Sequence, residues 1–215
     1  MARVLVLCAH PDLRQSRVNR ALLKAAREVA AGPAGANSVE VRDLYALYPD
    51  YVIDVPAEQE HAARADLIVW QHPVHWYAMP PLMKLWLDDV LALGWAYGAN
   101  GTALKGKDLW LVLSTGGSEA AYRPDGYNRY FFDAFLPPCE QTAALCGLRF
   151  LPPLVLHGAH TATPEAVGDH VARFVEHLRS YPAWPEMDDV LNCPACVVPA
   201  NERPSDAVMA EEVTP

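Results

Sequence analysis

The sequence lacks any apolar run long enough to cross a membrane. Its longest runs, such as residues 110–113, are far shorter than the roughly 20 residues that a spanning helix needs. Residues 1–3 lead directly into an apolar strand, with no signal-peptide region between them. The formal charge is −9 and there is no long basic stretch, whereas a nucleic-acid-binding face normally clusters lysine and arginine. These absences predict a cytoplasmic protein that does not bind nucleic acid.

Cysteines are few, and the glycine motifs of common nucleotide-binding folds are missing. Five cysteines in 215 residues do not suggest a disulfide framework, and we expect Cys8, Cys139 and Cys146 to be buried thiols. No G-x-G-x-x-G follows the first apolar segment, and no G-x-x-x-x-G-K-[ST] occurs anywhere. A bound phosphate would therefore have to be held by a hydroxyl-rich loop rather than by glycines.

What the chain does have is a regular alternation of apolar strands and amphipathic helices, with 52% hydrophobic residues. Unbroken apolar segments predict strands at 4–8, 39–41, 65–70, 108–114 and 150–157, and helical spacing predicts helices at 17–31, 81–93, about 130–146 and 164–180. This pattern predicts an α/β fold with a five-stranded parallel sheet wrapped by helices on both faces. One arrangement compatible with right-handed crossovers is the order 2-1-3-4-5, with its switch point between the first and third strands. We expect one domain over residues 1–184, followed by a proline-rich tail at 185–215 that is flexible or packed on a neighbour.

The loop after the first strand offers groups that suit a phosphate. A helix begins at or just after Ser16, and its free N–H groups and positive dipole end favour an anion. Asn19 adds a side-chain donor, and Arg14 or Arg17 adds positive charge. The alternative is that Ser16 is simply the N-cap of this helix.

The loop after the third strand is suited to a flat ligand. Two histidines, His72 and His75, precede the adjacent aromatics Trp76 and Tyr77, and prolines keep the segment irregular. The histidines could instead begin a metal site, but no cysteine or carboxylate lies nearby in the sequence to complete one, so we expect no metal. The aromatics could also be ordinary core residues. Exposure at the sheet edge, as a wall for an aromatic ring, is the reading we favour.

Two further segments reach the same edge or lie close to it. The turn at 114–117 contains adjacent glycines, which allow either a close backbone approach to a ring or merely a tight turn. The long excursion that follows contains Tyr122, Tyr127 and Tyr130, and it is predicted to be a substrate lid or a subunit interface. In the tail, Cys193 and Cys196 form a C-x-x-C pair. It lacks the second pair of a zinc ribbon and the βαβ setting of a redox motif, so we assign it no function.

Several uncommon strings in this sequence resemble one known family. Ala9-His10-Pro11 is followed by Ser16, Asn19 and the run 21–23, and the stretch 65–98 reads ADLIVWQHPVHWYAMPPLMKLWLDDVLALGWAYG. DLYALYPDYVID at 43–54, GTALKGK at 101–107 and CGLRFLPP at 146–153 add to the match. Over about residues 3–184 the chain resembles the NAD(P)H:quinone oxidoreductases with a flavodoxin-like fold. Its strongest likeness is to the branch that serves as the ancillary subunit of glutathione-gated potassium efflux systems.

The resemblance implies a homodimer that binds FMN, with FAD as the alternative. It implies two-electron, ping-pong hydride transfer from NAD(P)H to a quinone through that flavin. Tyr122 stands where related enzymes have a tyrosine that assists the quinone, and Tyr127 stands about where they have a histidine. The second reading is a regulatory subunit that binds a potassium efflux transporter at the inner face of the membrane. The resemblance assigns flavin binding to His10, Ser16, Arg17, Val18, Asn19, Val74, His75, Trp76, Tyr77, Ser114, Thr115, Gly116 and Gly117.

Overall fold

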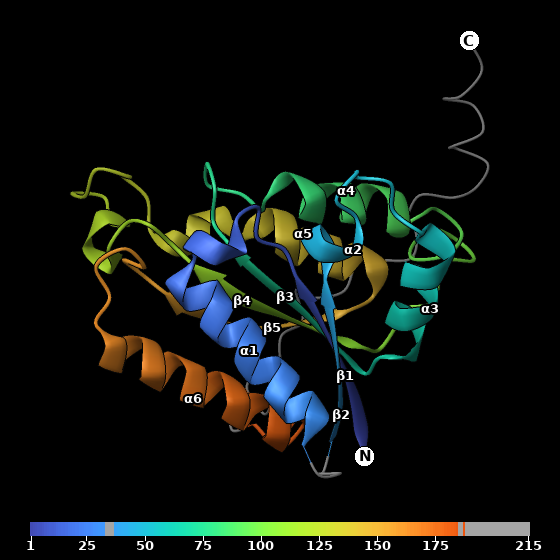
Figure 1. Ribbon diagram of the computed structural model, residues 1–215. Helices are drawn as coiled ribbons and strands as arrows, with labels where there is room; N and C mark the ends of the chain where they lie inside the picture. Colours follow the sequence, from blue (N-terminus) through green and yellow to red (C-terminus); the bar gives the residue numbers. More distant parts are fainter. Residues whose placement is uncertain (33–36, 185–186, 188–215) are drawn as a thin grey trace.

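The computed structural model describes residues 1–32, 37–184 and 187. Its five strands form one sheet in the order β2-β1-β3-β4-β5, and every neighbouring pair is parallel (Figure 1). All residues of β3 and β4 are buried, as expected for central strands covered on both faces. The predicted α/β class and strand order are therefore confirmed. The strands are β1 (Ala2–Cys8), β2 (Asn37–Asp43), β3 (Leu67–Pro73), β4 (Asp108–Ser114) and β5 (Arg149–Leu156).

Two helical layers cover the sheet, and alternate strand residues supply the two cores. Helices α1 (Arg17–Ala31) and α6 (Pro164–Ser180) pack on one face, over Val4, Val6 and Val69 among others (Figure 1). The other face, which includes Leu5 and Leu7, is covered by four helices. Within the described residues, none of the helices combines the length and apolar character needed to cross a membrane. The four helices are α2 (Leu44–Leu47), α3 (Val55–Arg64), α4 (Pro81–Val90) and α5 (Pro137–Cys146).

Some boundaries differ from the sequence expectation. Helices α2 and α3 were not predicted, because α3 carries few large apolar residues and buries a carboxylate instead. The helix expected from about residue 130 begins at Pro137, after a 3-10 turn at Phe132–Phe135. Proline suits a first helical turn, since the missing N–H would have no partner inside the helix there. Helix α4 ends at Val90 rather than at residue 93.

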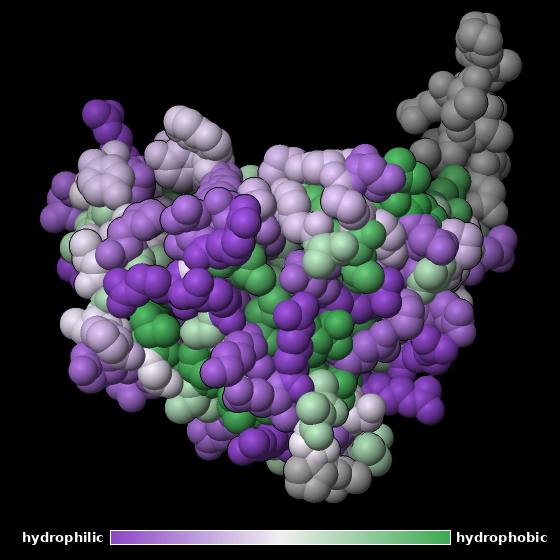
Figure 2. Space-filling view, viewed as in Figure 1, coloured by the Kyte–Doolittle hydropathy of each residue, from purple (hydrophilic) through white to green (hydrophobic). Residues whose placement is uncertain are grey.

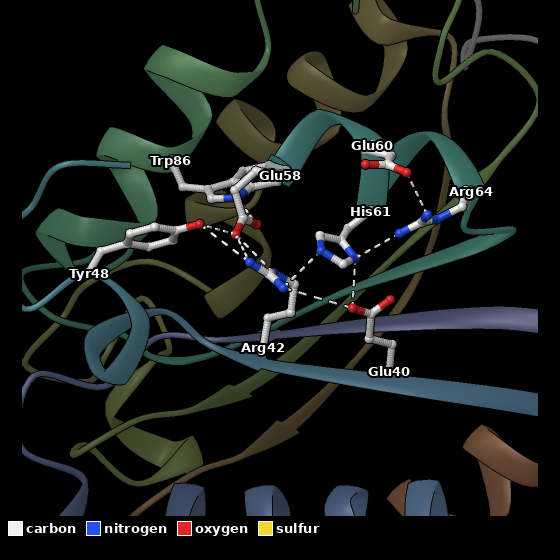
Figure 3. Close-up of polar contacts among 8 residues, drawn as sticks. All are labelled: Glu40, Arg42, Tyr48, Glu58, Glu60, His61, Arg64 and Trp86. Carbon is white, nitrogen blue, oxygen red and sulfur yellow. Dashed lines mark hydrogen bonds and ion pairs between the residues drawn. The ribbon is translucent and has the colours of Figure 1, made fainter. Parts of the chain in front are cut away.

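The buried carboxylate of α3 belongs to Glu58, which is 0% exposed. Its Oε1 accepts hydrogen bonds from Arg42 Nε (2.8 Å), from Arg42 Nη2 (2.5 Å) and from the Tyr48 hydroxyl (2.5 Å). Its Oε2 accepts one from Trp86 Nε1 at 2.8 Å. Figure 3 shows Arg42 also reaching toward His61, whose Nε2 lies 3.0 Å from Arg42 Nη1. The cluster connects β2, α3 and α4 through a fully hydrogen-bonded charge, which is the condition under which a buried ion is tolerated.

The three cysteines expected to be buried are buried and free. Burial raises the pKa of Cys139 and of Cys146 to about 11, so both remain protonated thiols at neutral pH. At the end of the domain, the Trp184 ring lies 4.8 Å from that of Trp110, and Met187 is buried in the same cluster. The rest of the expected tail, with its C-x-x-C pair, lies outside the described residues.

Candidate functional site

A cleft of about 390 Å³ opens at the carboxyl ends of β1, β3 and β4, next to the predicted switch point. Four loops contribute to it: those after β1, β3, β4 and β5. Most of the cofactor-binding residues expected from the sequence line this cleft. The lining residues are His10, Pro11, Asp12, Gln15, Ser16, Arg17, Val18, Asn19, Pro73, Val74, His75, Ser114, Thr115, Gly116, Ala159 and His160.

The N-terminus of α1 faces the cleft and is held there by side chains. Ser16 is the N-cap, and its hydroxyl accepts a hydrogen bond from the Asn19 N–H at 3.0 Å. The Asn19 side chain donates to Ser114 Oγ at 2.8 Å, and the Asn19 carbonyl accepts from Gln71 Nε2 at 3.1 Å. The first N–H groups of a helix have no partner inside the helix, so those of Arg17 and Val18 are suited to an anion. Ser16 therefore serves as a cap and also lines the cleft.

Asn19 has one buried polar atom without a partner. Its Oδ1 is buried, and within the described residues it has no hydrogen-bond partner. A buried acceptor without a partner is costly, about 1–3 kcal/mol. Because this oxygen is closed off from the open cleft, it does not by itself indicate a ligand there.

The two histidines at the mouth of the cleft are not equivalent. The rings of His10 and His75 meet edge to face at 6.2 Å. Burial, with a smaller contribution from His75, lowers the pKa of His10. The Asp12 N–H donates to His10 Nδ1 at 3.1 Å, so the neutral ring carries its proton on Nε2. His10 is thus a neutral donor at neutral pH.

The loop after β3 closes as a two-residue hairpin. The N–H and C=O groups of His75 and Ala78 exchange hydrogen bonds at 2.9 and 3.0 Å. The two central residues, Trp76 and Tyr77, have φ values of 49° and 64°, a type I′-like conformation that usually selects asparagine or glycine. Trp76 is 93% exposed, so the expected exposure of these aromatics is confirmed. Of the residues expected to bind the cofactor, Trp76, Tyr77 and Gly117 do not line the cleft.

His72 does not contribute to the cleft, although the sequence places it close to His75. It is buried in β3, where its Nδ1 lies 3.0 Å from the Pro73 carbonyl oxygen. Burial lowers its pKa to about 4. Of the two histidines, only His75 lines the cleft, because it belongs to the hairpin beyond the end of β3, whereas His72 lies within the buried strand. In the part of the chain that the structure describes, no three His, Cys, Asp or Glu side chains gather as a metal site would require.

The glycine turn after β4 is shaped by contacts within the protein. A Cβ at Gly117 would lie 2.6 Å from the Tyr127 hydroxyl, and a Cβ at Gly116 would lie 3.3 Å from His160 Nε2. Thr115 Oγ1 donates to the Gly117 carbonyl at 2.7 Å and also contacts His157 Nδ1 at 3.0 Å. A side chain at position 117 would therefore have to displace the end of the Tyr127 side chain, which packs directly against Gly117.

The two tyrosines expected to assist catalysis lie in different environments. Tyr122 is 7% exposed, and burial raises its pKa while a hydrogen bond with Thr115 lowers it. Tyr127 is 74% exposed, with its hydroxyl over Gly117. The loop that bears them contacts the hairpin, since the Tyr77 hydroxyl donates to Asn128 Oδ1 at 3.2 Å. Tyr122 is thus placed to position the turn, whereas Tyr127 is mostly exposed and places its hydroxyl against Gly117.

Sequence reasoning missed the loop after β5. Ala159 and His160 line the cleft, and the Ala162 carbonyl accepts a hydrogen bond from Arg17 Nη2 at 2.8 Å. The signal was present, because residues 158–160 follow the strand predicted at 150–157 and so reach the same sheet edge. Gln15, also unpredicted, lines the cleft from the turn before α1.

Fold and cleft together define a class: an α/β protein with an anion-accepting helix N-terminus at the switch point of its sheet. The chain belongs to the family described as having a flavodoxin-like fold, whose model matches residues 2–180. It is 43% identical over 183 residues to the glutathione-regulated potassium-efflux system ancillary protein KefF of Citrobacter koseri, with 85% of this chain and 97% of that protein covered.

Solved structures give the same fold. General stress protein 14 of Treponema denticola, solved in complex with FMN, is 37% identical with a TM-score of 0.72, covering 87% of this chain and 99% of its own. A protein described as a quinone reductase of Klebsiella pneumoniae is 27% identical with a TM-score of 0.71, and the match covers 85% of this chain and 86% of that one. A protein described as a thermophilic tryptophan halogenase of Streptomycin violaceusniger is 42% identical with a TM-score of 0.75, and the match covers 81% of this chain and 97% of that one.

Proposed function

We propose that the cleft binds FMN, with its phosphate at the N-terminus of α1. The observation that supports this most directly is the set of groups there: free helix N–H groups, the Ser16 hydroxyl and the Arg17 guanidinium. Asn19 lines the cleft beside these groups and would border the ribityl chain. His10, the hairpin with Trp76 and the turn at 114–117 would border the flat ring. A relative of the same fold was solved with FMN.

The test of this cofactor assignment is a titration of FMN fluorescence with protein stripped of its cofactor. Asn19→Leu removes the donor to Ser114 and the buried acceptor together, so we expect FMN affinity to fall by at least about tenfold, equivalent to 1.4 kcal/mol. Arg20→Leu, one residue further along α1 on its exposed face, is the matched control and should bind as the wild type does. Equal FMN affinity in both variants would remove Asn19 from the site, and failure of the wild type to bind FMN would overturn the assignment.

We infer further that the protein is an oxidoreductase that passes two electrons from NAD(P)H to a quinone. A bound flavin supplies the hydride-accepting and hydride-donating chemistry, while the protein supplies binding and orientation. Tyr127, which is mostly exposed and places its hydroxyl against the glycine turn, would donate a hydrogen bond to a quinone oxygen. Tyr122 positions the turn from below, and neutral His10 offers its Nε2–H at the mouth of the cleft.

A steady-state assay of NADH and NADPH oxidation, with a soluble quinone as acceptor, tests this reaction. Tyr127→Phe should lower kcat/KM for the quinone with little change for the nicotinamide, because it removes one hydroxyl from the acceptor side. Tyr130→Phe, on the same loop, is the control. A parallel reaction under air contains NADH, FMN, tryptophan and chloride, so that dioxygen is the oxidant that halogenation requires. A halogenated product without quinone reduction would overturn the proposal.

The likeness to a potassium-efflux ancillary protein supports a second proposed role. In this role the protein, as a homodimer, binds a membrane transporter at the cytoplasmic face. The exposed Trp76 at the hairpin tip and the exposed Tyr130 and Phe131 of the lid are contacts that such assembly would cover. Co-purification with a potassium efflux transporter, and its loss in Trp76→Ser, would support this role. A protein that elutes as a monomer and is not retained by such a transporter would contradict it.

A further inference from the structure

Helix α1 presents a line of cations to solvent in a protein whose formal charge is −9. The side chains recur every three or four residues, so they lie on one side of the helix and of the turn before it. All five are exposed. Three carboxylates lie close to them: Asp12 at 3.9 Å from Arg14, Glu28 at 3.7 Å from Lys24, and Asp43 at 3.4 Å from Arg27. The cations are Arg14, Arg17, Arg20, Lys24 and Arg27.

Beside this line runs a groove of about 310 Å³ with an apolar floor. Leu13, Leu23 and Ala31 form the floor, while Arg20, Lys24, Arg27 and Glu28 form the rim. Figure 2, seen from the same side as Figure 1, shows hydrophobic patches between hydrophilic side chains over α1. Such a groove fits a short segment that carries both acidic and apolar side chains.

The chain itself contains such a segment beyond the described domain. Residues 188–215 hold six acidic side chains and one basic one, Arg203. The last eleven, SDAVMAEEVTP, contain Asp206, Glu211 and Glu212 with no cation, and they include Val208 and Met209. The family model ends at residue 180, so this segment lies outside the part of the chain that the family shares.

The segment starts from the layer to which α1 belongs. Trp184 and Met187 are buried in the same core cluster as Val18, Leu22 and Ala26 of α1. Helix α1 has 15 residues and is about 22 Å long, whereas 28 extended residues span up to roughly 90 Å. The final residues can therefore reach any part of the groove.

We propose that residues 205–215 dock in the α1 groove of the same chain, as a built-in acidic ligand. The carboxylates of Glu211 and Glu212 pair with Arg20, Lys24 and Arg27, and Val208 and Met209 cover the apolar floor. Tethering gives the segment an effective concentration in the millimolar range for a short linker, which compensates for ion pairs that are individually weak. Because those pairs are exposed, salt weakens the docking. This surface does not depend on a flavin.

Zero-length carbodiimide cross-linking of the full-length protein, read by mass spectrometry, tests this contact. The chain has four lysines, and Lys24 is the one in the groove. We expect Lys24 to be joined to Glu211 or Glu212 at low ionic strength, and the yield to fall in about 1 M salt, where the screening length is about 3 Å. Lys84, exposed on α4 beside Asp88, is the internal control and should give no tail product.

Three results would overturn the proposal: no Lys24 product, equal products at Lys24 and Lys84, or products formed only between chains in a mixture of ¹⁴N- and ¹⁵N-labelled protein. A second measurement does not depend on cross-linking efficiency. In a chain ended after Met187, or with Glu211→Gln and Glu212→Gln together, acylation of the Lys24 amine should be about two- to fivefold faster, which corresponds to a contact of 0.4–1 kcal/mol. The rate at Lys84 should not change, and an unchanged rate at Lys24 would contradict the docking.

Discussion

At the scale of single residues, buried histidines give the protein a marked dependence on acid. His72 and His170 are both buried, and burial lowers the pKa of each to about 4. An unfolded histidine has a pKa of about 6.5, so between pH 6.5 and 4 the unfolded chain takes up protons that the folded chain refuses. The free energy of unfolding therefore falls as the pH is lowered from 6.5 to 4. Above pH 6.5 the two histidines make their full contribution to stability.

Replacing His72 with asparagine tests this at one position. The amide can still donate toward the Pro73 carbonyl, but it cannot be protonated in this range. We expect denaturant unfolding of His72→Asn to lose less stability between pH 6.5 and 4 than the wild type, by roughly 3 kcal/mol at most. His170, His10 and His157, whose pKa values burial also lowers, contribute to the remaining slope. His160→Gln, at an exposed position, should keep the full slope. Parallel pH curves for His72→Asn and the wild type would contradict this reading.

Trp76 stores backbone strain at the mouth of the cleft. It sits at φ 49° with a 93% exposed side chain, so little packing offsets the cost of the left-handed conformation. Asparagine tolerates this region better, and Trp76→Asn should raise the free energy of unfolding by about 1 kcal/mol. Trp76→Phe keeps the strain and should leave stability unchanged. Chemical denaturation of the three proteins measures the difference, and a destabilised Trp76→Asn would show that the indole makes contacts that the exposure does not reveal.

At the scale of elements, the Glu58 cluster holds α3 and α4 to the edge of the sheet. Its carboxylate accepts four hydrogen bonds from Arg42, Tyr48 and Trp86. Glu58→Gln keeps the shape but leaves the Arg42 guanidinium without its buried counter-charge, a change that costs about 3–5 kcal/mol in comparable pairs. Glu60→Gln, on the exposed side of α3, should cost less than about 0.5 kcal/mol. Equal midpoints for the two variants in denaturant unfolding would show that Arg42 is satisfied by its other neighbours.

The same elements show what the sequence could and could not predict. β4, α1 and α6 were predicted with their observed bounds, because each has a continuous apolar run or a clean helical stripe with punctuation at its ends. Helix α3 was missed because its buried side contains Glu58 and alanines, which no hydrophobic pattern reveals. Helix α5 was extended too far toward its N-terminus because Tyr130 and Phe131, which are exposed, read as an apolar face.

The positions of the loops that form the site could also be predicted in part from the sequence. Loops after the first, third and fourth strands were identified because parallel strands end at one edge of a sheet, and that rule needs only strand positions. The rule was not extended to the fifth strand, so Ala159 and His160 were missed. The direction of individual side chains could not be predicted either. His72 and Tyr122 are buried because distant segments of the chain pack over them, and a local pattern does not reveal such packing.

At the scale of the whole molecule, the sheet order brings four loops to one cleft and directs the N-terminus of α1 into it. The basic face of α1 continues from that cleft along the outside of the domain, so the acidic tail and an anionic cofactor would engage different parts of one helix. Quinone reduction and the docking of the tail are therefore separate properties that can be measured separately.

The most direct test of the central claim is an anaerobic titration of FMN-loaded protein with NADH or NADPH, followed by a quinone. We expect the visible absorption of the protein-bound flavin to be lost on addition of one of the nicotinamides. We also expect one equivalent of quinone to restore it. Absorption that persists with both nicotinamides, or that a quinone does not restore, would contradict a two-electron quinone reductase.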